Sequence, residues 1–290
     1  MIKLTYILLC LIWGSTLLAI KLALADAPPL WSAGLRFLIA GLILIIINRF
    51  RKVIYPISVK EIVRISLPGL IIYAFPYMLV YHAEQYISSA LTAVLFASFP
   101  FFIAAYSIFL LKSEKPNIYA WSGLAVGFSG VVMVFYDSLV TSEFVLLGAV
   151  LVVPASAISA LGTIVLRVWY NDEDFTLMVC LQSLAGAVVI MAAAIIFEPL
   201  SSFRVTFLSV GALLYLAIFG SVLAFTGYYW LLKRMKVITL SLLAFITPVI
   251  AVGLEYLLLS EYFLLSPRPG RCLYCAELFW LLKSNLFCLS

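Results

Sequence analysis

Aromatic side chains recur at fixed spacing in two distant apolar stretches of the sequence. Tyr77 and Tyr81 lie four residues apart, which places them on one face of a helix. A shift of 148 residues aligns these two tyrosines with Phe225 and Tyr229. Such faces can enclose a partly apolar solute. Core packing or an interfacial aromatic belt produces the same pattern, and both interpretations stay open at this point.

Further candidate residues for a solute cavity are Trp13 and Ser15, which flank a glycine in the first apolar stretch. A third group consists of ionisable side chains inside apolar stretches or at their ends: Lys21, Arg36, His82 and Glu255. Charges in such places are costly and tend to face a cavity or a partner.

These ionisable residues have different candidate roles. Lys21 and Arg36 could attract an anionic group, although both side chains are long enough to snorkel to the surface. His82 could titrate near neutral pH and act as a gate or couple to protons, and Glu255 could carry a proton. The alternative for each is a structural or interfacial role.

The sequence contains none of the enzyme signatures HExxH, GxSxG or the P-loop. One histidine excludes a site built from several histidines, and the single Cys272-x-x-Cys275 pair lacks a second pair of ligands. We therefore expect no enzyme, no metal and no cofactor. An integral-membrane enzyme would need acidic, His or Cys residues clustered at one depth.

The composition requires a lipid environment. Of 290 residues, 66% are apolar and 11% are charged, against about 45–50% and about 25% in soluble domains. A soluble core cannot absorb this excess. The basic residues lie at segment ends, so the net charge of +5 does not indicate nucleic-acid binding. The expected surroundings are a lipid bilayer and the expected ligand is a small molecule.

The apolar segments predict ten membrane-spanning helices, since about 20 apolar residues cross a bilayer. They lie near 4–24, 30–48, 63–83, 89–111, 117–135, 145–166, 175–197, 206–231, 238–259 and, weakly, 272–289. We expect the first to be retained rather than cleaved as a signal peptide, because it is long and Lys21 interrupts its end. Lys and Arg gather in the loops after the even-numbered segments, which predicts a cytoplasmic N-terminus.

The two halves of the chain repeat one plan. A shift of 146 aligns 20–42 with 166–188, and a shift of 148 aligns 80–104 with 228–252. Five spans per unit place the second copy upside down, as in the inverted repeats of secondary transporters. Pro100 aligns with Pro248. Each proline could bend its helix near a central site, or could be a packing kink.

Several motifs resemble the EamA-type transporters of the drug/metabolite transporter superfamily. They are "IWGSTLLAIKLAL" (12–24), "PPLWSAGLRFLIAGLIL" (28–44), the segments 81–117 and 226–261, and the glycine-rich "SGLAVGFSGVVMVF" (122–135). The resemblance implies an all-α integral membrane protein with two inverted five-helix repeats, at 1–140 and 141–290. It also implies a cavity lined mainly by helices 1–4 and 6–9, and leaves a homodimer possible.

One departure from the family pattern lies at the end of the chain. After residue 262 the sequence lacks a counterpart of the glycine-rich fifth helix, so nine spans plus an altered end is the alternative to ten. The resemblance implies a secondary transporter at the inner or plasma membrane that exports amino acids or related metabolites. A multidrug or nucleotide-sugar-type carrier is the alternative within the superfamily, and a non-transporting scaffold or receptor is the alternative outside it.

Overall fold

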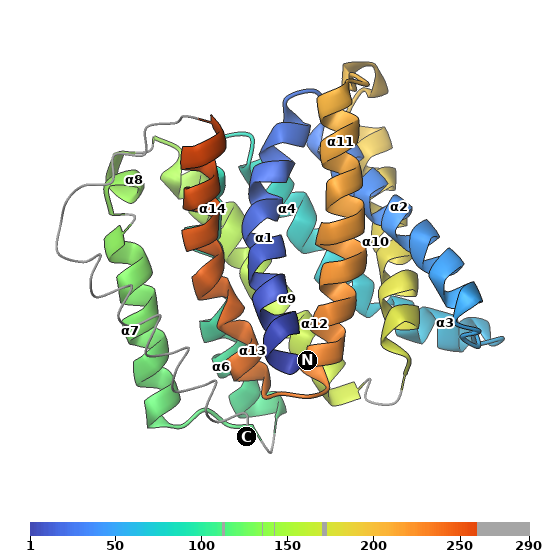
Figure 1. Ribbon diagram of the computed structural model, residues 1–290, viewed down its shortest axis with the longest axis horizontal. Coiled ribbons are helices and arrows are strands. Elements are labelled where there is room, and N and C mark those ends of the chain that lie inside the picture. The colour runs from blue at the N-terminus through green and yellow to red at the C-terminus, as the bar shows by residue number, and fades with distance from the viewer. Residues whose placement is uncertain (112–113, 135, 142, 170–172, 260–290) are drawn as a thin grey trace.

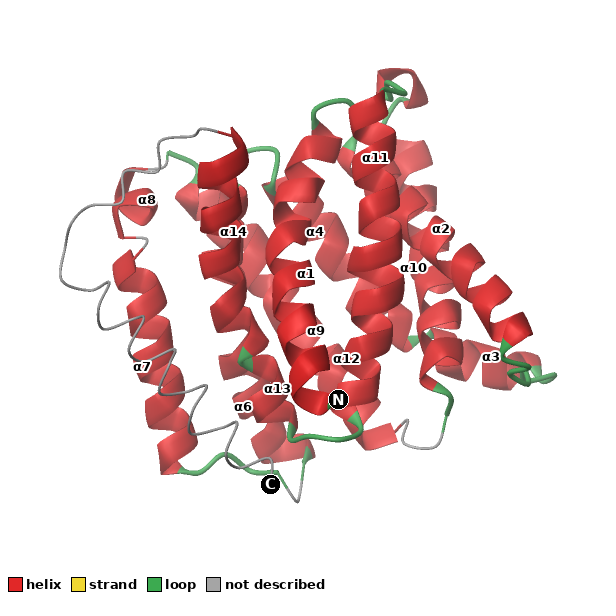
Figure 2. Cartoon of the chain, in the orientation of Figure 1, coloured by secondary structure: helices red, strands yellow, loops and turns green. Residues whose placement is uncertain are grey.

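The computed structural model consists of helices joined by short loops (Figure 2). It describes residues 1–259 except 112–113, 135, 142 and 170–172, and in this part it contains no strand. Seven helical segments are long and apolar enough to cross a membrane, and two apolar segments are shorter. The described part therefore has the architecture of an integral membrane protein. The weak span 272–289 and the altered end lie outside the described residues.

Four of the long spans are continuous α-helices: α1 (Ile2–Leu24), α2 (Pro29–Phe50), α9 (Val145–Trp169) and α10 (Phe175–Phe197). Local signals explain their starts. Pro29 occupies the first turn of α2, where a missing N–H costs nothing. The Asp174 side chain accepts hydrogen bonds from the backbone N–H groups of Thr176 and Leu177 and so caps α10.

The other spans are interrupted. One comprises α3 (Val59–Ser66), the π-helical η1 (Leu70–Ala74) and α4 (Phe75–Ala83), and another comprises α11 (Phe207–Tyr215), the π-helical η3 (Leu216–Leu223) and α12 (Ala224–Leu232). These two spans occupy matching places in the two halves of the chain. A π-helix changes the rotation per residue, so it re-aims the side chains that follow it.

The two proline-containing spans are also divided. The first comprises α5 (Ser89–Phe96) and α6 (Phe99–Leu110), and the second comprises α13 (Val237–Ser241) and α14 (Leu243–Leu259). Pro100 lies in the first turn of α6, directly after the interruption. Pro248 lies inside α14, several residues after the interruption at Leu242. The two prolines therefore differ in their relation to the break.

The remaining described elements are α7 (Ile118–Val134), α8 (Tyr136–Thr141) and the short η2 (Leu200–Ser202). Figure 1 shows α7 at one edge of the molecule and α2, α3 and α10 toward the opposite edge, with α1 between them. The N-terminus lies at the same end of the bundle as α3 and α13 (Figure 1).

Helices α2 and α10 form the closest helix pair across the two halves. The buried face of α2 presents Ala33, Phe37 and Ala40 at spacings of four and three. A Cβ atom added at Gly41 would lie 2.5 Å from a methyl carbon of Leu184 on α10. Small residues thus allow the close approach that stabilises helix pairs in lipid, where dispersion contacts replace the hydrophobic effect.

Candidate functional site

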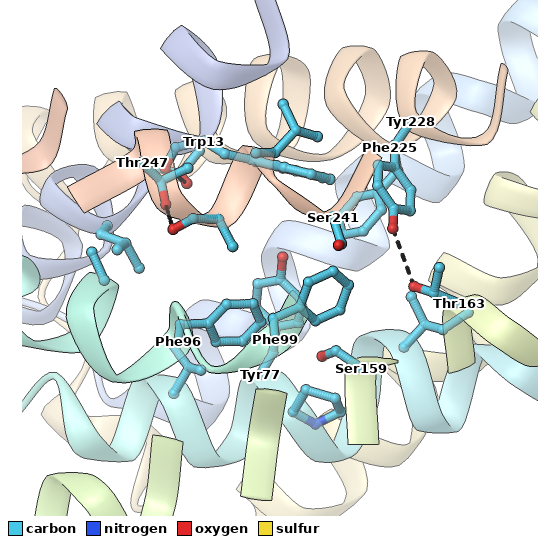
Figure 3. Close-up of a pocket in the computed structure, with 18 of the residues that line it drawn as sticks. Trp13, Tyr77, Phe96, Phe99, Ser159, Thr163, Phe225, Tyr228, Ser241 and Thr247 are labelled. Atoms are coloured by element: carbon cyan, nitrogen blue, oxygen red, sulfur yellow. Dashed lines mark hydrogen bonds between the residues drawn. The ribbon is translucent and has the colours of Figure 1, made fainter. Parts of the chain in front are cut away.

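A cavity of about 130 Å³ lies between the two halves of the chain. That is roughly ten times the ~10–15 Å³ that one water needs. Its walls come from α1, η1 and α4, α5 and α6, α9, α12, and α13 and α14 (Figure 3). Helices α2 and α10 contribute no lining residue among those described and pack behind this ring, which narrows the set of lining helices that the family resemblance implies.

Aromatic rings form one part of the wall. The Trp13 ring packs edge-on against Phe225, with centroids 5.6 Å apart, and lies 5.1 Å from the Tyr228 ring. Tyr77 packs edge-on against Phe225 at 6.2 Å. The indole Nε1 of Trp13 is buried and has no hydrogen-bond partner in the described part of the protein. This N–H is a donor that a solute could use.

Hydroxyl groups form another part of the wall, and Figure 3 shows several of them. The Thr163 and Tyr228 hydroxyls lie 3.3 Å apart. Ser241 donates to the carbonyl of Ile238, on its own helix, at 2.7 Å. A hydroxyl that donates to its own backbone keeps its lone pairs available to accept hydrogen bonds from a ligand. No charged residue is among the lining residues described, so the cavity is mostly apolar, with uncharged hydroxyls as its polar groups.

The lining residues recur in pairs at the two shifts found in the sequence. Three pairs are separated by 146 residues and five by 148. The pairs are Trp13 and Ser159, Leu17 and Thr163, Ile20 and Leu166, Tyr77 and Phe225, Val80 and Tyr228, Ala93 and Ser241, Phe96 and Ala244, and Phe99 and Thr247. Equivalent positions of the two halves therefore face one cavity. The second half supplies hydroxyls at several positions where the first half supplies apolar side chains.

The structure distributes the predicted cavity residues over two environments. Trp13, Tyr77, Phe225 and Tyr229 line the cavity. Ser15 is not among the lining residues; its hydroxyl lies 2.6 Å from the hydroxyl of Tyr215 on α11.

Tyr81 also lies behind the cavity wall. It is fully buried, and its hydroxyl accepts a hydrogen bond from Arg36 at 3.4 Å. The Tyr229 hydroxyl likewise points away from the cavity, toward Gln182 Oε1 at 2.6 Å. Tyr81 and Tyr229 thus occupy equivalent positions and bond to equivalent positions, because a shift of 146 aligns Arg36 with Gln182.

Sequence reasoning missed several lining residues, namely Thr16, Phe96, Phe99, Ser159, Thr163, Tyr228, Ser241 and Thr247. The repeat carried a usable signal for one of them. Applying the shift of 146 to the predicted residue Trp13 leads to Ser159. Whether the remaining residues face the cavity depends on how the π-helices and helix breaks rotate the following side chains. Hydrophobic periodicity alone does not reveal this rotation.

The predicted ionisable residues do not gather at one site. Lys21 Nζ donates to the carbonyl of Ile87 at 3.4 Å. His82 Nδ1 lies 3.0 Å from Gln85 Nε2 at the end of α4. Arg36 is 1% exposed inside the protein, so snorkelling does not describe it. The side chain of Glu255 lies outside the described residues. No group of three His, Cys, Asp or Glu that could hold a metal occurs in the described part.

An ion pair between Arg167 and Glu114 lies next to the cavity wall. Arg167 donates from Nε and Nη2 to Glu114 Oε1 at 2.9 and 2.5 Å, and Nη1 donates to the Leu232 carbonyl at 2.6 Å. Glu114 Oε2 also accepts from the backbone N–H of Val237 at 2.8 Å. The neighbouring Leu166 lines the cavity. Glu114 therefore joins the end of α6, the end of α9 and the start of α13.

Comparison with known proteins agrees with this geometry. The model of the EamA-like transporter family matches residues 1–136 and 146–267. The chain is 27% identical to the uncharacterized transporter YoaV of Bacillus subtilis, over 93% of this chain and 92% of YoaV. It is 32% identical to the uncharacterized inner membrane transporter YedA of Escherichia coli K12, over 84% of this chain and 78% of YedA.

Two further similarities extend the comparison. The chain is 28% identical to the protein PagO of Salmonella typhimurium, over 88% of this chain and 84% of PagO. A solved crystal structure superposes with a TM-score of 0.78 at 20% identity, over 99% of this chain and 96% of that chain, and so shows a shared fold. Because the family model covers most of the sequence, this chain is a member of the EamA-like transporter family.

Proposed function

We propose that this protein is a secondary transporter that carries small solutes through the central cavity by alternating access. The observation that carries the proposal is the pairing of lining positions 146 or 148 residues apart. In transporters built from repeats, the solute site lies at the interface of the repeats near the middle of the membrane. A cavity that both halves line through equivalent residues fits that plan.

The same observations support ten helices in two inverted repeats. Five apolar segments precede α9 in the chain, so α9 crosses the membrane in the direction opposite to α1. The N-terminus shares its end of the bundle with α3 and α13 (Figure 1), next to loops that carry many of the Lys and Arg residues. Because positive loops stay in the cytoplasm, the proposed N-terminus is cytoplasmic.

The cavity chemistry narrows the solute class. Its volume of about 130 Å³ is below the ~300–1,000 Å³ of pockets for drug-sized ligands, which favours small metabolites over bulky drugs or nucleotide sugars. Aromatic rings and uncharged hydroxyls suit a molecule with one apolar and one hydrogen-bonding part. Together with the family resemblance, this supports amino acids and related metabolites as solutes, with export as the direction.

Within this proposal the residues have distinct roles. Trp13, Tyr77 and Phe225 contact the apolar part of the solute. Tyr229 contributes its ring to the wall and its hydroxyl to the contact with α10. The helix interruptions before α6 and α14 act as hinges. Pro100 fits the first turn of α6, where no helical hydrogen bond is lost, whereas Pro248 removes one backbone hydrogen bond inside α14 and permits a further bend there.

Counterflow in proteoliposomes tests the function. Vesicles containing the purified protein are loaded with an unlabelled mixture of amino acids, and uptake of each radiolabelled amino acid from outside is measured. The proposal predicts transient accumulation of at least one labelled solute above the level of protein-free vesicles. Uptake equal to that of protein-free vesicles for amino acids and for a wider metabolite panel would contradict transport.

A further inference from the structure

Arg36 is a cation buried inside the membrane-spanning part of the protein. It is 1% exposed and lies in the first half of α2. Its Nε donates to Ser221 Oγ at 2.8 Å, Nη2 to the Gly220 carbonyl at 3.0 Å and Nη1 to Tyr81 Oη at 3.4 Å. All three acceptors are neutral. The guanidinium has five N–H donors, so these three bonds leave it with further donor capacity and its full charge.

Among the described residues, no carboxylate forms a salt bridge with Arg36. The helices that pack against α2 are α1, α4, α10 and the segment formed by α11 and η3. The residue ranges of these helices contain no aspartate or glutamate; their basic residues are Lys3, Lys21 and His82, and their other titratable groups are tyrosines and cysteines. Glu84 follows α4 directly and is 2% exposed, and its Oε2 accepts a hydrogen bond from Ser89 Oγ at 3.1 Å. Glu198 accepts from the backbone N–H of Leu30 at 2.9 Å, which is six residues, or about 9 Å along the helix axis, from Arg36.

The aromatic ring of Tyr77 connects Arg36 with the cavity. The guanidinium carbon of Arg36 lies 4.9 Å from the centroid of the Tyr77 ring, and Tyr77 is a lining residue of the cavity (Figure 3). The charge of Arg36 is thus separated from the cavity by one side chain. A buried charge that forms no direct ion pair is costly to keep, and such residues in membrane proteins characteristically serve a solute or ion pathway.

We propose that Arg36 gives the central cavity its selectivity for solutes that carry a carboxylate. The proposal rests on the transport function above and names the chemical class for that site: amino acids or small organic acids, as opposed to amines and neutral molecules of the same shape. Arg36 acts here as a positioning residue. Its positive field passes through the Tyr77 ring and supplies the counter-charge that the uncharged lining residues lack.

Coulomb's law gives the size of the expected effect. A carboxylate in contact with the cavity side of Tyr77 would lie about 8–9 Å from the guanidinium, which is the 4.9 Å to the ring centroid plus a contact of about 3.5–4 Å. At an effective dielectric constant of about 20, a unit charge pair at this separation changes affinity by roughly one to one and a half orders of magnitude.

Matched solute pairs test the proposal on the unmodified protein. The probes are L-leucine and 3-methylbutan-1-amine, L-phenylalanine and 2-phenylethylamine, and L-threonine and 1-aminopropan-2-ol, which differ by the carboxylate. Thermal stabilisation in detergent measures binding, and counterflow in proteoliposomes measures transport. We expect at least one acid to bind about tenfold or more tightly than its amine. Equal binding within all three pairs, or no binding by any of the acids, overturns the proposal.

Two variants and a control assign the effect to Arg36. Arg36→Gln should reduce the preference for the acid about tenfold, whereas Arg36→Lys, which keeps the charge but loses the planar fork, should retain most of it. Arg49→Gln makes the same change on the exposed end of the same helix and should leave the preference unaltered. A folded Arg36→Gln protein with unchanged preference overturns the proposal.

The two proposals fail in different ways. Equal counterflow of amines and acids would contradict the proposed carboxylate selectivity but would still support the transport function. Absence of counterflow for every solute would remove the transport function itself. If Arg36→Gln gives no cooperative melting transition, the wild-type comparison of acid and amine decides the question without any variant.

Discussion

The hydroxyl of Tyr229 donates a 2.6 Å hydrogen bond to Gln182 Oε1, and the repeat-equivalent residues Tyr81 and Arg36 are joined by a 3.4 Å hydrogen bond. In each pair, a tyrosine from the third span of one half contacts the second span of the same half. The geometry has been kept while the chemistry has changed, since one half contains a cation where the other contains an amide. Two halves with equivalent contacts and different side chains can therefore provide a site whose two sides differ chemically.

The rings of Tyr77 and Phe225 are predicted to contact the solute. Tyr77→Ala and Phe225→Ala should each cost about 1–3 kcal/mol of solute binding because a large apolar contact is lost. The apparent transport constant in counterflow should rise about five- to hundredfold at near-normal expression. Tyr77→Phe keeps the ring and serves as the control. A well-expressed double variant with an unchanged transport constant would assign these rings to packing alone.

The Glu114–Arg167 pair is predicted to hold one end of the cavity closed. In a variant without native cysteines, a cysteine at Ser241 on the cavity wall reports access from that end. Glu114→Gln should speed its reaction with an impermeant thiol reagent about tenfold or more, since breaking a largely buried ion pair favours the open arrangement. Glu61→Gln disrupts an exposed pair with Arg64 and should not change the rate. Equal labelling rates in the parent protein and in both variants would show that the ion pair does not keep this end of the cavity closed.

The topology prediction concerns Ser58, an exposed residue that precedes α3 in a basic loop. A cysteine placed there should resist an impermeant thiol reagent in intact cells and react after permeabilisation. The reason for this expectation is that short loops rich in Lys and Arg stay on the cytoplasmic side of a membrane. Labelling in intact cells would invert the proposed orientation.

Close contact between the third span and α10 predicts that position 69 tolerates only glycine. A Cβ added at Gly69 would lie 2.7 Å from the Cα atom of Gln182, and the backbone cannot move aside as a side chain can. Gly69→Ala should destabilise the protein by about 1–3 kcal/mol. Gly211→Ala, where a Cβ meets nothing within 4 Å, should be neutral or slightly stabilising in a detergent melting experiment. Similar melting temperatures for both variants would contradict this packing.

Acid sensitivity is expected at the start of α10. Partial burial raises the pKa of Asp174, but hydrogen bonds from Thr176 and Arg51 outweigh burial and hold the pKa below its ordinary value of 3.8. A lowered folded-state pKa contributes stability above the unfolded value, and this stability is lost as the pH falls through the folded pKa. The melting temperature of the wild type should thus exceed that of Asp174→Asn at pH 6. The difference should shrink as the pH falls below about 4, and a constant difference would exclude this linkage.

Much of the fold follows from the sequence because lipid imposes one dominant constraint. Apolar length alone predicted the span near 175–197, which coincides with α10 (Phe175–Phe197). The prolines predicted bends in two spans, but not the positions of the breaks after Phe96 and Ser241, and the π-helices were not predicted. They depend on tertiary packing of backbone groups that hydrophobic periodicity does not encode.

The candidate site was only partly predictable. Tyr77 and Phe225 follow from spacing and the repeat, and both line the cavity. The sequence could not separate Tyr77 from Tyr81, because the two share a helix face. Only the contact with Arg36, on the neighbouring helix α2, places Tyr81 behind the wall. The burial of Arg36 was equally hidden, since a long cationic side chain can snorkel or turn inward from the same backbone position.

Filling the cavity tests the central claim most directly. Ser241→Phe adds a ring to the wall of a cavity of about 130 Å³, whereas Ser122→Phe adds the same ring at an exposed position on α7. Counterflow of an amino acid that the wild-type protein transports is then measured at equal amounts of folded protein. The transport account predicts that Ser241→Phe abolishes counterflow and that Ser122→Phe preserves it. Normal counterflow by folded Ser241→Phe would contradict the assignment of this cavity as the solute site.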